Sequence, residues 1–245
     1  MRATGIFAAI HLAGTALLLW LGYTWLGMGE ARAGALAGSF AVALAFLLLT
    51  CWLYGASFPF FETRRIPSAF GTALRKLPAL IAAAIAVLVI YALLARLENA
   101  LSNPGFKLAS WLTMKLRKPV RPYAVAHDIR AIFWVLRWIV LPILLAPMAA
   151  AIATTGWRGF RAIGRGVWRR FNWLKIPVLV LAGLWVPLKM LAWAPHMKTF
   201  RMEMASFVAR AGVAYLLFIA GWLLLAFAMS AGRPVRTQPS TVPSP

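Results

Sequence analysis

The sequence predicts an all-α polytopic membrane protein: a bundle of six transmembrane helices with two basic amphipathic interfacial helices. Three observations predict this fold class. Of the 245 residues, 62% are hydrophobic and the mean hydropathy is +0.79, which is more apolar than a water-soluble domain requires. The apolar residues form six runs, each close to the roughly 20 residues that cross a bilayer. Most basic residues lie between these runs or at their ends.

The six spans belong to a single predicted transmembrane domain, residues 1–230. They cover about residues 6–27, 33–57, 78–97, 131–155, 176–193 and 204–230. Kinks are expected at the prolines inside spans, Pro142, Pro147 and Pro187, because each proline removes a backbone donor. Residues 231–245 are rich in Pro, Ser and Thr and are predicted to be a disordered tail.

The first two spans each carry a feature with two interpretations. Span one resembles a signal peptide that would be cleaved near Ala31-Arg32-Ala33, but its length and the interruption by His11 favour a retained span. His11 itself is expected to be a hydrogen-bonded core residue rather than a functional one. Span two opens with Gly34 and Gly38, a spacing that permits close helix approach or dimerisation but is common in alanine-rich spans.

The segment between spans four and five has the clearest amphipathic pattern. At about 100° per residue, residues 157–171 place aromatic and arginine side chains on opposite sides of a helix, as in helices that lie in the membrane interface. The predicted headgroup ligands are Arg158, Arg161, Arg165 and Arg169. The predicted interfacial anchors are Trp157, Phe160 and Phe171. A second, less regular interfacial helix is predicted over residues 104–118.

The charge balance predicts the partner. The chain has 26 Lys and Arg against 5 Asp and Glu, a net charge of +21. On a membrane protein such an excess favours anionic lipid headgroups rather than nucleic acid. A homo-oligomer or a protein partner remains an alternative. The arginine-rich and alanine-rich composition fits a bacterial gene, and the inner membrane is the expected location. The basic residues are divided almost equally between the two sides of the predicted topology, so both termini are placed in the cytoplasm because that side carries the more amphipathic helix and the shorter connections.

Two segments share a motif. Arg75-Lys76-Leu77-Pro78 and Leu174-Lys175-Ile176-Pro177 each follow a basic segment and begin an apolar run. A duplicated helical hairpin or a common way of starting a span would explain the match. The six spans and these two motifs together resemble uncharacterised bacterial membrane proteins. They also resemble the membrane-anchor domain of some glycerophosphodiester phosphodiesterases. The resemblance implies no catalytic residues, because the soluble phosphodiesterase domain is absent.

A second candidate site is an anion basin near spans four to six. Arg137, Lys189 and Arg210 lie inside or near the ends of these spans and would clamp a phosphate or carboxylate. The alternative is that each side chain extends to the interface by itself.

Catalysis has little support in the sequence. Hydrolase, metalloprotease and P-loop motifs are absent, no span holds a carboxylate pair, and the single cysteine is Cys51. An enzyme would need His11, His127 or His196 to meet Asp128 or Glu203. We therefore expect no cofactor and no metal. The leading prediction is a non-enzymatic accessory or scaffold protein of the cell envelope that binds anionic lipid, and the alternative is a transporter or flippase-like carrier of an anionic or lipidic substrate.

Overall fold

The computed structural model describes residues 2–28, 33–102, 105–117, 119, 121–163, 172–195 and 199–230. All regular elements within these residues are helical, and six helical stretches are long and apolar enough to cross a membrane. The predicted fold class is confirmed: the chain is an all-α, multi-pass membrane protein. Residues 231–245, the predicted tail, lie outside the described residues.

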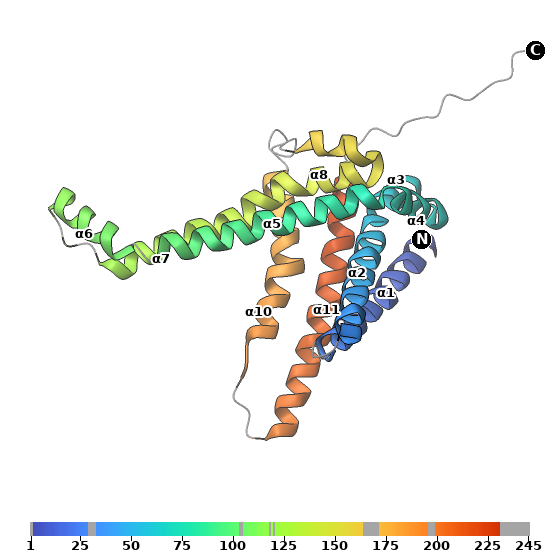
Figure 1. Ribbon diagram of the computed structural model, residues 1–245, viewed down its shortest axis with the longest axis horizontal. Coiled ribbons are helices and arrows are strands. Elements are labelled where there is room, and N and C mark those ends of the chain that lie inside the picture. The colour runs from blue at the N-terminus through green and yellow to red at the C-terminus, as the bar shows by residue number, and fades with distance from the viewer. Residues whose placement is uncertain are drawn as a thin grey trace, which may run out of the picture.

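Four of the six spanning stretches run side by side (Figure 1). They are α1 (Arg2–Leu26), α2 (Ala33–Gly55), the stretch formed by α9 (Asn172–Val180), η3 (Leu181–Trp185) and α10 (Val186–Ala192), and α11 (Phe200–Ser230). The aligned apolar side chains of these helices make their mutual packing and their contact with lipid favourable.

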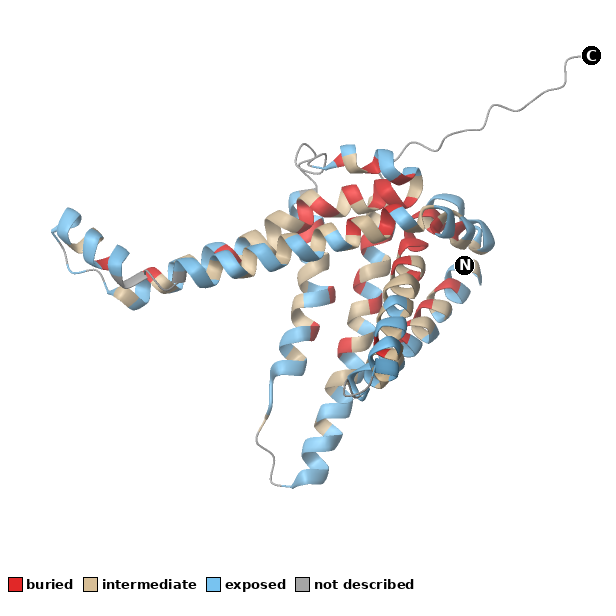
Figure 2. Cartoon of the chain, in the orientation of Figure 1, coloured by how far each residue is buried: buried red, intermediate tan, exposed pale blue. Residues whose placement is uncertain are grey.

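The other two stretches form a long antiparallel pair that runs across one end of the four (Figure 1). One is α5 (Leu77–Ser102); the other comprises α7 (Pro122–Val135), η1 (Leu136–Val140) and α8 (Leu141–Thr155). The part of this pair that extends away from the remaining helices comprises the end of α5, the helix α6 (Gly105–Leu116) and α7, and we call it the arm. Buried residues concentrate where the pair meets the four helices, and the arm is mostly exposed (Figure 2).

Prolines alter two of the spanning stretches. One π-helical turn ends two residues before Pro142, and another ends two residues before Pro187. Leu141 N–H bonds to Leu136 C=O, and Val186 N–H bonds to Leu181 C=O, in the wider i to i−5 pattern. A wider turn accommodates the donor that proline lacks and the space its ring needs, as π-bulges do in other helices.

Two short helices follow α2, in the segment between spans two and three. They are α3 (Ser57–Thr63) and α4 (Ile66–Arg75), separated by Arg64 in a left-handed conformation. Ala69 and Ala73 bury one face of α4, and Phe7 stacks on Phe60 with ring centroids 3.8 Å apart. This packing holds α3 and α4 against the start of α1.

The segment after α8 differs from the α-helix predicted over residues 157–171. Gly156 ends α8 with φ 68°, and Gly156–Ala162 forms a 3-10 helix, η2, that folds back on α8. A Cβ on Gly159 would lie 2.3 Å from the backbone nitrogen of Ile152, so only glycine allows this contact. Helical periodicity does not reveal a chain reversal of this kind, which depends on two glycines.

The close glycine contact between spans is not the one that the sequence suggested. Gly34 and Gly38 have no neighbouring atoms where a side chain would be added. Gly183 of η3 and Gly221 of α11 instead face each other, and a Cβ on Gly183 would lie 2.8 Å from the Gly221 Cα. The missing side chains let the two backbones approach closely.

Candidate functional site

Positive charge gathers where α1, α3 and α4 lie near the start of α5, the end of α8 and the start of α9 (Figure 1). We call this the basic end, and its described basic residues are Arg2, Arg64, Arg65, Arg75, Lys76, Arg158, Arg161 and Lys175. All are exposed except Lys76, which is half-buried. Glu62 is the one acidic residue among the described residues of these segments. The basic end is therefore strongly positive and solvent-facing.

Lys76 has the most defined position of these residues. It lies between α4 and α5, and its stem crosses Gly156 at the end of α8, where a Cβ would lie 3.0 Å from the lysine Cδ. Lys76 forms no ion pair with any acid of the described residues. Gly156 thus both ends α8 and leaves room for a half-buried cation beside the helix carboxyl end, where the helix dipole favours positive charge.

The predicted headgroup and anchor residues fall partly on η2. Arg158 and Arg161 are exposed there, and Trp157 is 63% exposed. Phe160 instead packs partly buried against the main core and stacks with Trp157, the ring centroids being 5.9 Å apart. Arg165, Arg169 and Phe171 lie outside the described residues. The geometry of η2 therefore leaves one of the anchors, Trp157, facing outward beside the two arginines.

Arg137, from the predicted anion basin, forms an ion pair within the α5–α7 hairpin. Its Nη2 lies 2.6 Å from Glu98 Oε2, and Tyr91 Oη donates to the Arg137 carbonyl at 3.0 Å. Both ionic side chains are partly buried. The ion pair compensates the charge of Arg137 inside the span, and it joins α5 to η1.

Lys189 and Arg210 also make local contacts. Arg210 donates to the backbone carbonyls of Met190 and Trp193 at the end of α10, and so caps that helix from α11. The Lys189 ammonium lies 5.8 Å from the Trp185 ring centroid, within cation–π range. Neither residue lines the two cavities described below, and neither does Arg137. The structure thus gives each predicted basin residue a separate structural partner.

His11 belongs to a buried chain of hydrogen bonds. Its Nδ1 lies 3.2 Å from the Phe7 carbonyl and its Nε2 lies 2.9 Å from Ser57 Oγ, which Trp222 Nε1 approaches to 3.1 Å. Because a carbonyl only accepts, Nδ1 donates, so Nε2 accepts from Ser57 and Ser57 accepts from Trp222. The chain joins α1, α3 and α11. His11 is fully buried, as expected of a core histidine.

The other histidine in the described residues has a carboxylate neighbour but no cleft. His127 Nδ1 lies 3.8 Å from Asp128 Oδ1, and both side chains are more than two-thirds exposed. His196 lies outside the described residues. No group of three His, Cys, Asp or Glu side chains with metal-ligand geometry occurs among the residues that the structure describes.

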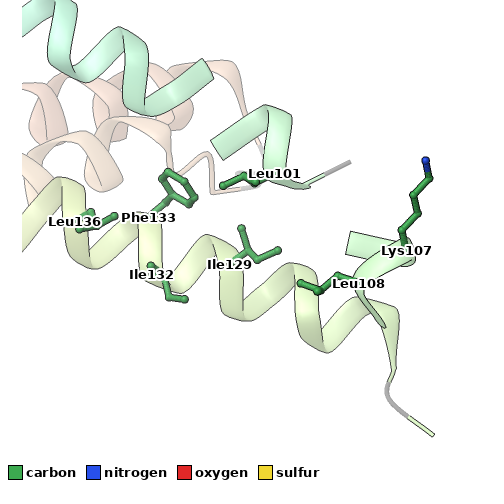
Figure 3. A pocket seen from close by; sticks show the side chains of 7 residues that line it. All are labelled: Leu101, Lys107, Leu108, Ile129, Ile132, Phe133 and Leu136. Carbon is green, nitrogen blue, oxygen red and sulfur yellow. The ribbon is translucent and has the colours of Figure 1, made fainter. Parts of the chain in front are cut away.

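Apolar cavities lie among the described helices, and two of them border α5. The arm cavity, of about 650 Å³, lies between α5, α6 and α7, and its lining includes Leu101, Ile129 and Phe133 (Figure 3). Among the described residues of its lining, Lys107 is the one that is charged, and it extends away from the apolar side chains (Figure 3). The central cavity, of about 550 Å³, lies between α2, α5, α8, α9–η3 and α11. Sequence periodicity gave no indication of either cavity.

No protein-family model, curated protein or solved structure matches this chain. The resemblance to the membrane-anchor domain of glycerophosphodiester phosphodiesterases therefore stays a prediction.

Proposed function

We propose that this chain is a non-enzymatic accessory or scaffold protein of the cell envelope that binds anionic lipid headgroups through its basic end. The proposal is supported by the composition of the basic end, whose segments carry eight basic residues and one acidic residue among those that the structure describes. Arginine and lysine at the membrane surface attract anionic lipids, each contributing about 1 kcal/mol. Arg158 and Arg161, beside the exposed Trp157, are the proposed headgroup ligands on η2.

The contacts of Arg137 and Arg210 favour this function over a carrier. A carrier would use these spanning arginines to hold an anionic substrate, whereas Arg137 is paired with Glu98 and Arg210 caps α10. By the preference for positive charge in the cytoplasm, we place the basic end and both termini on the cytoplasmic side of a bacterial inner membrane.

The proposal is tested by lipid-dependent thermal stability in detergent. A ligand that binds only the folded state raises the unfolding temperature. Phosphatidylglycerol should raise it for the wild type more than phosphatidylcholine does, and Arg158→Gln with Arg161→Gln should reduce that difference. Lys115→Gln with Arg117→Gln on the arm is the matched control, with equal charge loss. An equal effect of the two lipids on the wild type would refute the proposal.

A further inference from the structure

We propose that the central cavity binds one hydrocarbon chain of an anionic phospholipid whose headgroup lies against Lys76 and Lys175. The inference rests on the proposed function and adds to it a defined intramembrane site. The proposed occupant of the cavity is one lipid acyl chain.

The cavity is apolar and lies within the spans. Its wall includes Phe46 and Cys51 of α2, Leu88 of α5, Leu184 of η3 and Phe218 of α11. None of the described residues that line it is charged. A volume of about 550 Å³ is in the range of small-molecule sites. An apolar chain is the ligand that gains most from such a wall, because each buried methylene contributes about 0.8 kcal/mol.

The depth of the cavity matches one leaflet. On α2 its lining extends from Phe46 to Gly55, nine residue steps or roughly 14 Å of helix at 1.5 Å per residue. Half of a hydrocarbon core about 30 Å thick is about 15 Å. Gly55 is at the basic end, directly before α3, and Phe46 lies deeper. A chain that enters from the basic end would reach Phe46 near the bilayer midplane.

Two lysines of the basic end lie one helical turn from the cavity lining. Leu80 lines the cavity from α5, and its N–H bonds to the Lys76 carbonyl at 3.0 Å. Leu179 lines it from α9, and Lys175 precedes it by four residues, on the same helix face. These are the matching lysines of the two related motifs that the sequence contains. The shared motif therefore places one cation beside the cavity on each of two helices.

Lys76 differs from the other basic residues of the basic end in its burial. It is half-buried and has no carboxylate partner among the described residues, so its charge is only partly solvated. A lipid phosphate would supply the missing anion. The arm cavity lacks this arrangement, because Lys107 extends away from its lining (Figure 3).

The test is photo-crosslinking of the full-length protein in nanodiscs. The probe is phosphatidylglycerol with a diazirine at the end of one acyl chain, and mass spectrometry locates the crosslinks. We expect crosslinks at cavity-lining residues that are not exposed on the outer faces, at Leu47, Val180 and Phe218. The same diazirine on phosphatidylcholine should give at least several-fold fewer. Crosslinks spread evenly over outward residues such as Leu44 and Leu216 would show annular lipid and overturn the inference.

Variants test the two ends of the site separately. Lys76→Met with Lys175→Met removes the charges and keeps the apolar stems, and Ala84→Leu with Ala149→Leu fills the cavity. Each pair should lower the crosslinking of these lining residues several-fold. Lys115→Met on the arm and Ala92→Leu, exposed on α5 and outside the cavity, are the controls. Size-exclusion chromatography checks that each variant is folded. If a variant does not fold, the crosslink map of the wild type still tests whether the cavity is occupied.

The outcomes separate this inference from the proposed function. If phosphatidylglycerol is preferred but the crosslinks stay on the outer faces, the basic end binds lipid and the cavity site is refuted. If the two lipids crosslink equally within the cavity, the cavity binds a chain but the headgroup contribution of Lys76 and Lys175 is refuted. If neither lipid is preferred and the cavity is unlabelled, both proposals fail.

Discussion

At the scale of single residues, Gly156 determines where span four ends and how the basic end forms. Its φ of 68° and ψ of −139° are accessible almost only to glycine, and the space that it leaves holds the stem of Lys76. The sequence places a glycine after an apolar run, which permits but does not require such a stop. The predicted helix over residues 157–171 continued past this point because arginine and aromatic spacing alone favoured it.

Gly156→Ala should therefore destabilise the protein. The backbone would have to leave its conformation or hold a strained one, at a cost of about 1–3 kcal/mol. Thermal unfolding in detergent measures the effect. Gly71→Ala is the control, because Gly71 is in α4 with open space around it, and it should be neutral or slightly stabilising. Equal unfolding temperatures for Gly156→Ala and the wild type would contradict the role of Gly156.

Ser57 is the centre of the buried hydrogen-bond chain. Ser57→Ala would leave His11 Nε2 and Trp222 Nε1 without partners, and each buried unsatisfied group costs about 1–3 kcal/mol. We expect a lower unfolding temperature and a changed fluorescence of Trp222. Ser68→Ala, on the exposed face of α4, serves as the comparison. If Ser57→Ala and Ser68→Ala behave alike, the hydrogen-bond chain contributes little to stability.

At the scale of elements, the sequence was informative about spans and uninformative about contacts between them. Hydropathy alone locates six apolar helices, because the bilayer requires a fixed length and internal backbone hydrogen bonding. The pairing of Gly183 with Gly221 was not predictable, since a lone glycine in an apolar run has no periodic signal. The same holds for the ion pair of Arg137 and Glu98, whose partners are 39 residues apart.

The packing of α11 against η3 should depend on these two glycines. Gly221→Leu would force the helices apart, because a Cβ at Gly221 would lie 2.4 Å from the Gly183 Cα. A steric change of this size costs several kcal/mol or prevents folding, so the yield of monodisperse protein should fall sharply. Gly212→Leu on the same helix, with no neighbour within 4 Å, should be tolerated. Similar yields from both variants would refute the close contact.

At the scale of the whole molecule, the basic end unites segments that are far apart in the sequence. The helices α1, α5, α8 and α9 each begin or end there (Figure 1), and Arg2, Lys76, Arg158 and Lys175 lie at or beside those helix ends in the sequence. Charge counts along the chain could not predict this, since both sides of the predicted topology carry many basic residues. The apolar cavity below the basic end likewise depends on five helical stretches and could not be read from any one of them.

The most direct test of the central claim is native mass spectrometry of the wild-type protein released from nanodiscs of equal phosphatidylglycerol and phosphatidylcholine content. We expect the retained lipid adducts to be predominantly phosphatidylglycerol, because the positive basic end selects the anionic headgroup. Adducts that mirror the equal composition of the nanodisc, or no adducts at all, would contradict anionic-lipid binding and leave the basic residues as topology signals.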